Sequence, residues 1–235
     1  MLTNAEIKRI KSLKDKKFRD QYGQFVVEGE KMVQEALDSG FSVAAVYRES
    51  EIGTEAMARM SQLTSPSPIL AVVDKPQPHG LVLERGLYLG LDSVRDPGNM
   101  GTILRLADWF GIDTVFASMD SVEIFNPKVV QASMGSVFRV AAVYCDLPEI
   151  CRRFSRSDMP VYGTFLDGED IYSATLADEG LIIMGNESKG IRLETAGGCS
   201  SRLRIPSYAH GSTAESLNVA TACAVVLAEF RRRQR

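Results

Sequence analysis

The sequence has very few of the residues from which metal sites and hydrolytic triads are built. Only two histidines, His79 and His210, occur among 235 residues, so a histidine-based metal centre or a Ser-His-Asp triad is hard to assemble. The four cysteines show no CxxC spacing and lie in apolar or helix-compatible stretches. We therefore expect no metal, and reduced core thiols in a cytoplasmic protein.

Long apolar runs and an excess of positive charge are missing as well. No stretch is long enough to span a bilayer, and the charged N-terminal segment has no apolar core typical of a signal peptide, so no membrane partner is expected. The formal net charge of -3 argues against a protein coated with cations for nucleic-acid binding. Any nucleic-acid contact must come from a local patch.

Hydrophobic patterning predicts two α/β units on either side of a proline-containing connector at residues 75–80. The boundaries expected from this pattern are residues 1–80 for a small N-terminal domain and 81–235 for a larger one. Strands are expected in the first domain at 24–29, 42–47 and 69–74, with helices at 30–39 and 54–63 between them.

The second domain alternates apolar strands with helix-compatible stretches. Its strands are expected at 87–92, 114–118, 139–145, 160–166, 181–185 and 202–206. Near-continuous apolar strands in such an alternation favour a parallel sheet covered on both faces. Ligands of these sheets bind beyond the carboxyl ends of the strands, so the loops that follow strands are the informative ones.

Three such loops carry polar and glycine residues. The first runs over 93–111, places Asn99 where it can cap a helix and brings Arg105 inside that helix. The second is Asn186-Glu187-Ser188-Lys189-Gly190, and the third leads through 207–214 to Ser216, Leu217 and Asn218. No GxGxxG fingerprint is present, so a dinucleotide site is not favoured. A surface role for Arg105 and a capping role for Ser216 or Ser212 are the simpler alternatives.

The closing segment, residues 215–233, is predicted to form a helix that is apolar on almost every side. A helix of this kind is normally buried within protein. The polar residues of its first turn, Ser216 and Asn218, must therefore find partners in the fold or face a ligand.

The N-terminal segment concentrates positive charge between residues 8 and 19. Isoleucine and leucine recur there at helical spacing, and the other positions hold the cations Lys8, Arg9, Lys11, Lys14, Lys16, Lys17 and Arg19. Such a local field suits RNA phosphates. The alternative is an ordinary solvated helix face.

Three segments together resemble a known family. DPGNMGTILRLADWFG, IIMGNESKGI and IPSYAHGSTAESLNVATACAVVLAEFRRR look like the three ordered motifs of the SpoU (TrmH-type) RNA ribose methyltransferases of the SPOUT superfamily. Residues 126–138 resemble the segment between the first two motifs, and the N-terminal unit is similar to the RNA-binding extension of the members that modify 23S ribosomal RNA. The resemblance covers nearly the whole chain.

The resemblance implies an α/β-knot fold with a mostly parallel sheet, in which the C-terminal part of the chain makes a deep trefoil. It implies a cleft for S-adenosylmethionine formed by the backbone at Gly185, Ile205 and Leu217, with Thr164 as a further contact. This chain departs from many members in having a longer loop between Ile205 and Ser216.

The implied reaction is methyl transfer to a ribose 2′-hydroxyl. The positions that match the family's reaction site are Asn99, Arg105, Glu187, Ser216 and Asn218. In the family the matching arginine is often assigned as the base. Because deprotonating an arginine near neutral pH is costly unless the site compensates, stabilising the developing alkoxide and gripping the adjacent phosphate is the role expected of Arg105. The resemblance also implies a homodimer and a ribosomal RNA partner. A tRNA substrate and a non-catalytic RNA-binding role in ribosome assembly are the alternatives.

Overall fold

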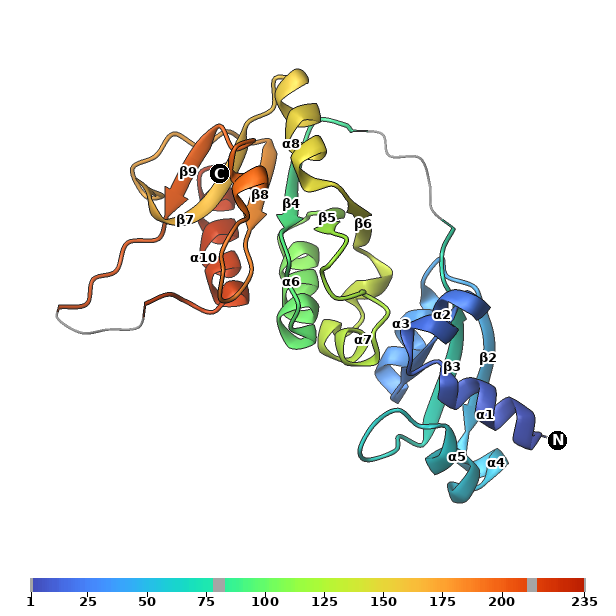
Figure 1. The fold of residues 1–235 in the computed structure, drawn as a ribbon. Helices are drawn as coiled ribbons and strands as arrows, with labels where there is room; N and C mark the ends of the chain where they lie inside the picture. Colours follow the sequence, from blue (N-terminus) through green and yellow to red (C-terminus); the bar gives the residue numbers. More distant parts are fainter. Residues whose placement is uncertain (1, 78–82, 211–214, 235) are drawn as a thin grey trace. The chain divides into compact units, whose positions relative to one another are not determined.

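A computed structural model of the chain describes residues 2–77, 83–210 and 215–234 (Figure 1). The chain divides into two compact units: residues 1–81 with 123–139 form unit 1, and residues 82–122 with 140–235 form unit 2. No helix in these three described ranges is long and apolar enough to cross a membrane.

Unit 1 is built on a three-stranded antiparallel sheet in the order β1-β3-β2. The central strand β3 (Ile69–Asp74) has five of its six residues buried, and β1 (Gln24–Glu28) and β2 (Val43–Arg48) flank it. Each strand starts within one residue of the position predicted from the sequence. The apolar residues of β1 and β3 supply the core of this unit.

Helices cover this sheet. They are α1 (Asn4–Ser12), α2 (Lys16–Tyr22), α3 (Glu30–Asp38), α4 (Glu49–Ile52) and α5 (Thr54–Met60). The expectation that the basic segment forms one helix is wrong: it forms α1 and α2, because Asp15 occupies the N-cap position of a second helix. Six of the seven predicted RNA-binding cations are therefore divided between α1 and α2, and Lys14 lies in the turn between them.

A segment from between the expected strands of the second domain also belongs to unit 1. Residues 123–139 form α7 (Pro127–Ser133) and a short 3-10 turn, Ser136–Phe138. The ring of Phe125 lies 4.5 Å from that of Phe25, and Phe138 joins the same aromatic cluster. A domain boundary near residue 80 stays a prediction. Residues 123–139 follow that position in the sequence, and their phenylalanines complete the aromatic core of unit 1.

Unit 2 contains a six-stranded sheet in the order β6-β5-β4-β8-β7-β9, and every neighbouring pair is parallel. Its strands are β4 (Leu87–Leu91), β5 (Thr114–Ser118), β6 (Ala141–Cys145), β7 (Val161–Asp170), β8 (Gly180–Met184) and β9 (Ser201–Arg204). The mostly parallel sheet of the predicted α/β-knot class is confirmed.

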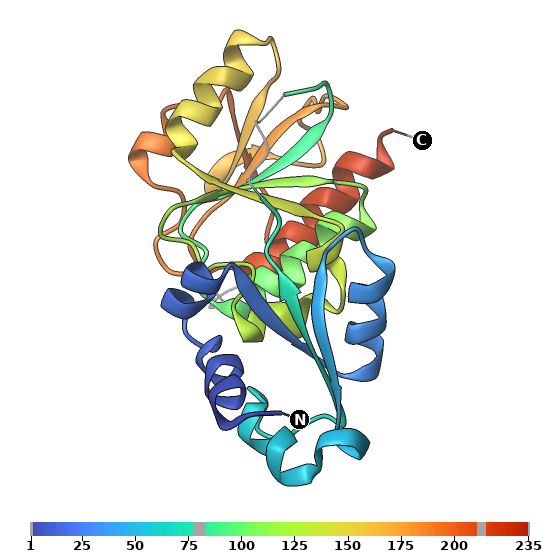
Figure 2. The same cartoon turned by 90° about the vertical axis from the view of Figure 1, so that its right-hand side faces the viewer.

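Helices lie on both faces of this sheet. On one face α6 (Pro97–Trp109) and α10 (Val219–Arg232) lie side by side, while α8 (Leu147–Arg156) covers the other face (Figure 2). The short α9 (Leu193–Ala196) contacts α8. This two-sided cover explains why the inner strands β4, β5 and β8 read as continuous apolar runs.

The closing helix is shorter than predicted. It begins at Val219, because Asn218 occupies the N-cap position and accepts hydrogen bonds from the amides of Ala220 and Thr221. Ser216 and Leu217 lie before the helix, where both are exposed and Ser216 is part of a bend. A capping role for Ser216 is therefore wrong, and Ser212, the other expected cap, lies outside the described residues.

Candidate functional site

The first and second of the predicted loops leave neighbouring strands at the same edge of the sheet. β4 and β8 pair in parallel, and the amide of Asp92 continues this pairing by donating to the carbonyl of Met184 at 2.8 Å. The loop after β4 leads into α6, and the loop after β8 begins at Gly185. Parallel pairing is thus what brings motifs far apart in the sequence to one place.

The first loop is shaped by the start of α6. Asp96 is the N-cap, and its side-chain oxygen accepts from the amide of Asn99 at 2.8 Å. Pro97 fills the first helical position, where a missing N–H costs nothing. These contacts fix the first turn, so the side chain of Asn99 points away from the cap toward the other loops.

A chain of side-chain hydrogen bonds links the three motifs. Asn218 Nδ2 donates to Asn99 Oδ1 at 2.9 Å, and Asn99 Nδ2 donates to Glu187 Oε1 at 3.0 Å. Glu187 Oε2 accepts from Asn186 Nδ2 at 3.1 Å. The structure therefore brings together three of the five predicted catalytic residues: Asn99, Glu187 and Asn218.

The backbone fixes the direction of this chain. The Asn218 oxygen already accepts hydrogen bonds from the amides of Ala220 and Thr221 in the first turn of α10, so its Nδ2 group is left to face Asn99. Asn99 must then accept through its oxygen and donate through its nitrogen, which requires an acceptor at Glu187. One helix N-terminus thus orients two amides and a carboxylate in sequence.

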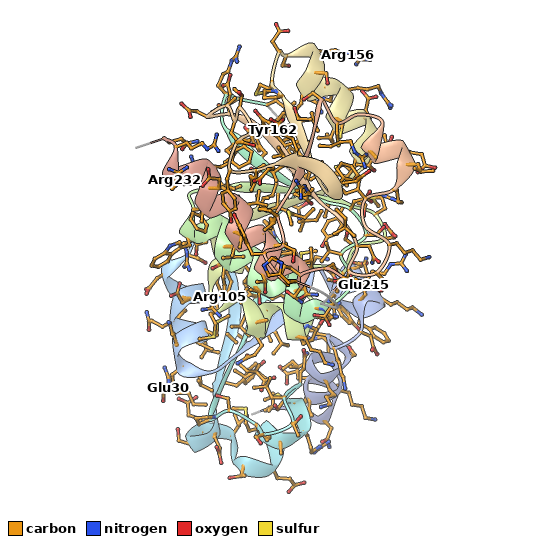
Figure 3. All side chains as sticks on the ribbon, turned by 90° about the vertical axis from the view of Figure 1, so that its left-hand side faces the viewer. Glu30, Arg105, Arg156, Tyr162, Glu215 and Arg232 are labelled. Atoms are coloured by element: carbon orange, nitrogen blue, oxygen red, sulfur yellow. The ribbon has the colours of Figure 1, made fainter. Side chains whose placement is uncertain are left out.

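The other two predicted catalytic residues lie apart from this chain. Arg105 extends from the exposed side of α6, six residues beyond Asn99, or about 9 Å along the helix axis (Figure 3). Ser216 is exposed in the segment before α10. Within the described ranges neither side chain is hydrogen-bonded to Asn99, Glu187 or Asn218, so both are free to meet a ligand.

The predicted cofactor positions differ in their surroundings. The hydroxyl of Thr164 donates to the carbonyl of Ile183 at 2.9 Å, which ties β7 to β8. At Gly185 a Cβ atom would come within 2.4 Å of the carbonyl carbon of Gly190, so only glycine lets this loop fold back on itself. Ile205 is half-buried and Leu217 is 51 % exposed. Contact of these residues with a cofactor stays a prediction.

Sequence reasoning missed the ion pair that anchors the second loop. Asp92 is fully buried, and it accepts from the Arg192 amide at 2.9 Å and from Arg192 Nε at 2.7 Å. Asp120 lies beside this pair, and hydrogen bonds from Arg95, Ser93 and Ser118 hold its pKa well below the usual range despite its desolvation. The sequence feature that could have indicated this ion pair is the carboxylate of Asp92, which comes directly after an apolar strand.

Most of the predicted RNA-binding cations have partners inside unit 1. Arg19 is 2 % exposed and donates to Glu123 at 2.7 Å and to the carbonyls of Leu13 and Lys14. Arg9 donates to Gln24, Lys11 to the carbonyl of Ser61, and Lys16 to Asp20. Arg19 is thus a structural residue in this unit. Lys8, Lys14 and Lys17 are exposed, as are the hydrogen-bonded Lys11 and Lys16.

One cation of this region was not predicted. Lys8, Lys11 and Lys14 line a shallow hollow of about 470 Å³ together with Arg59 of α5, and Asp15 is the one acid among the described residues that line it. Arg59 is distant in sequence but close in space because α1 packs against α5. The hollow presents more positive charge than the N-terminal helix alone.

The cysteines are packing residues. Cys151 and Cys223 are buried, and desolvation raises the pKa of both thiols to about 12. Burial likewise raises the pKa of Cys145 and of Cys199 to about 11. Thiols of this kind are poor nucleophiles. Across the described ranges no cluster of three or more histidine, cysteine or acidic side chains is arranged to hold a metal ion.

Comparisons with known proteins match both units. A profile of the SpoU rRNA methylase family matches residues 86–228, and a profile of the MRM3-like substrate binding domain matches residues 4–75. The 23S rRNA (guanosine(2553)-2'-O)-methyltransferase RlmP of Bacillus subtilis is 31 % identical over 97 % of this chain and 96 % of its own length.

Solved structures agree over the whole length. A TrmH-family protein of Porphyromonas gingivalis is 39 % identical, with a TM-score of 0.90 and 99 % of both chains covered. The AdoMet-bound rRNA methyltransferase of Sinorhizobium meliloti is 29 % identical, with a TM-score of 0.85, covering 100 % of this chain and 97 % of its own.

Proposed function

The chain belongs to the SpoU rRNA methylase family, and on this basis we propose that it transfers the methyl group of S-adenosylmethionine to a ribose 2′-hydroxyl of ribosomal RNA. As a member of this family the protein is an RNA methyltransferase, and S-adenosylmethionine is its cofactor. The 23S rRNA activity of the Bacillus relative supports ribosomal RNA over the alternative, tRNA.

The residues fit a cofactor held mainly by backbone. Gly185 allows the loop after β8 to turn tightly, Ile205 directly follows β9, and Leu217 lies just before α10. We assign Gly185, Ile205, Leu217 and Thr164 to cofactor binding. When bound, the cofactor supplies a methyl group on a sulfonium, which is a good electrophile.

The protein's part in the reaction is alignment and electrostatics. The reacting groups must be held in line, water must be excluded, and the hydroxyl proton must be removed or shared. We assign Arg105 to stabilising the negative charge that develops on the 2′-oxygen, since a guanidinium is a permanent cation with a planar set of donors. Ser216 lies next to Leu217 and is assigned to hydrogen-bonding the ribose.

The observation that carries this proposal is the oriented chain Glu187–Asn99–Asn218. It joins one residue from each motif. Asn218 Oδ1 caps α10, while the other amide groups of Asn218 and Asn99 bond to side chains of the other motifs. We propose that it holds the three loops at a fixed spacing, so that Arg105 and Ser216 meet the ribose between them. A protein retained only for RNA binding would have no need of this arrangement.

The direct test is methyl transfer from labelled S-adenosylmethionine to ribosomal RNA isolated from cells that lack the gene, followed by mapping of 2′-O-methyl positions. We expect one modified ribose, and binding of S-adenosylmethionine but not of NAD in a calorimetric titration. RNA binding without transfer to rRNA or tRNA would instead favour the ribosome-assembly role.

Unit 1 is proposed to bind the RNA through its exposed lysines. The triple charge reversal of Lys8, Lys14 and Lys17 to glutamate should flatten the slope of log affinity against log salt by about 2 to 3, because each phosphate contact contributes about 0.7 to 0.9. Binding of S-adenosylmethionine should not change. Anisotropy on an rRNA fragment across a salt series measures both.

A matched control reverses three exposed cations of unit 2, Arg85, Arg152 and Arg156, whose side chains are 66 %, 53 % and 70 % exposed. The net charge changes by the same amount, so any difference reports position rather than total charge. Equal slopes for the two triple variants would mean that the lysines form an ordinary solvated face.

We also propose that the protein is a homodimer in the cytoplasm, where a ribosomal RNA substrate is found. The α6–α10 face supports a dimer, since Trp109 on α6 is 84 % exposed and Leu217 before α10 is 51 % exposed. Leu104 of α6 and Phe230 of α10 are already buried within one protomer, so they are not available to a partner. Light scattering of wild type and Trp109→Ser tests this: a stable, active wild-type monomer would contradict it.

A further inference from the structure

The edge of the unit 2 sheet carries a stacked arginine that has no part in the site above. β9 is the last strand of the sheet and pairs with β7 (Figure 1). The guanidinium carbon of Arg202 in β9 lies 3.5 Å from the ring centre of Phe165 in β7. At that separation a planar guanidinium lies flat on the ring in van der Waals contact.

Two further contacts fix this stack. Arg202 Nη2 donates to Asp167 Oδ1 at 2.6 Å, which holds the guanidinium from its edge. The ring of Phe165 lies over Gly163, where a Cβ atom would come within 2.4 Å of ring carbon Cε2. A side chain at position 163 would therefore displace the ring on which Arg202 stacks.

The outer face of the guanidinium is open. The Arg202 side chain is 46 % exposed although one face is covered by Phe165 and one edge is held by Asp167. Leu166, between Phe165 and Asp167 in β7, is 72 % exposed. Phe165 and Asp167 already desolvate one side of this flat cation and hold it in place. Stacking a ligand on its open face therefore costs little further conformational entropy of Arg202.

The position of the stack relates it to the proposed reaction. Arg202 lies three residues before Ile205, or about 10 Å along the strand. Its pairing partner in β7 is Gly163, next to Thr164. An RNA whose ribose reaches the carboxyl edge of the sheet can therefore extend a neighbouring nucleotide over this surface.

We propose that Arg202, supported by Phe165 and Asp167, is a stacking platform for an unpaired RNA base next to the modified nucleotide. Unpaired bases stack on arginine planes and aromatic rings in sequence-specific and in sequence-tolerant RNA binding. This inference rests on the proposed RNA methyltransferase function but adds a subsite that reads a base face rather than a phosphate.

The test compares Arg202→Ala with Arg202→Lys in the full-length protein. Stacking one base contributes enough that either variant should weaken binding of a 12-nucleotide oligo-adenylate by about 5- to 150-fold. Lysine keeps the charge but has no plane, so it should not rescue binding. The salt slope should stay nearly unchanged in both variants, well short of the change of about 0.7 that losing one single-strand phosphate contact produces. The affinity for S-adenosylmethionine should stay the same.

Two controls separate stacking from charge and from folding. Arg152→Ala removes an arginine of similar exposure, 53 %, that is paired with Glu149 on α8, and should leave oligonucleotide binding unchanged. Phe165→Leu keeps apolar packing but removes the flat support, and should weaken binding as Arg202→Ala does. In methylation assays Arg202→Ala should raise the KM for rRNA with little change in kcat.

Either of two results would overturn the platform. Full binding by Arg202→Lys together with a slope lowered by about one unit in Arg202→Ala would make Arg202 a phosphate contact. Wild-type affinity in Arg202→Ala would mean that no RNA lies there. The oligonucleotide assay needs no methyl transfer, so a failure of the proposed activity, seen as wild type that does not methylate rRNA, is recognised separately.

Discussion

Arg105→Ala is expected to abolish methyl transfer, with kcat lowered about 100- to 1,000-fold or more, while the affinity for S-adenosylmethionine stays within about twofold. The reason is that Arg105 is exposed on α6 and is assigned to the charge on the 2′-oxygen, whereas the cofactor is assigned to Thr164 in β7 and to Gly185, Ile205 and Leu217. Single-turnover transfer and calorimetry measure the two quantities.

The lysine variant tests the chemical nature of this role. Arg105→Lys should fail almost as completely, because a point-charge ammonium does not reproduce a planar fork of donors. The matched control Arg156→Ala removes an arginine that is 70 % exposed on α8 and should keep full activity. If Arg105→Lys retains most of the activity, a simple positive charge is sufficient and the guanidinium assignment is wrong.

Because Arg105 has no hydrogen bond to the Glu187–Asn99–Asn218 chain within the described residues, its loss should not loosen the site. Thermal unfolding of Arg105→Ala should therefore match wild type, as for most exposed substitutions. A large drop in Tm would point instead to a structural role for Arg105, and the loss of activity would then say little about chemistry.

Arg19→Ala is expected to destabilise unit 1 by about 3 to 5 kcal/mol, since removing one partner of a buried ion pair leaves the other without compensation. Glu123, with a side chain 10 % exposed, would keep only Lys75 as a cationic partner. The carbonyls of Leu13 and Lys14 would lose their donor as well. Denaturant unfolding followed by far-UV circular dichroism measures the change.

The control lies in the same helix. Lys16 pairs with Asp20, but the two side chains are 64 % and 44 % exposed, so Lys16→Ala should change the free energy of unfolding by only about 0 to 1 kcal/mol. Equal effects of Arg19→Ala and Lys16→Ala would mean that Arg19 is not the internal anchor described above.

The Arg19 result also bears on RNA binding. Because Arg19 is buried against Glu123, it is not available to a phosphate, and Arg19→Ala should leave the salt slope of RNA binding unchanged at temperatures where the protein stays folded. A slope lowered by about one unit would return Arg19 to the RNA-binding set.

Much of this protein is determined by local patterns in its sequence. Alternating and continuous apolar runs located every strand within about two residues of its start, because side-chain burial follows backbone periodicity. The motifs identified Asn99, Glu187 and Asn218 as one group, and the structure joins these three by hydrogen bonds. The resemblance also gave the family and the mostly parallel sheet, both of which are confirmed.

Tertiary structure decided what depends on partners distant in the chain. Arg19 looks like its basic neighbours in sequence, yet Glu123, more than a hundred residues away, makes it an internal residue. Phe125 and Phe138 complete the core of unit 1 from beyond the expected boundary, and the Asn218 cap sets where α10 begins. Local periodicity carries no information about which distant side chain will neutralise a charge or fill a hole, because that depends on how strands and helices pack together.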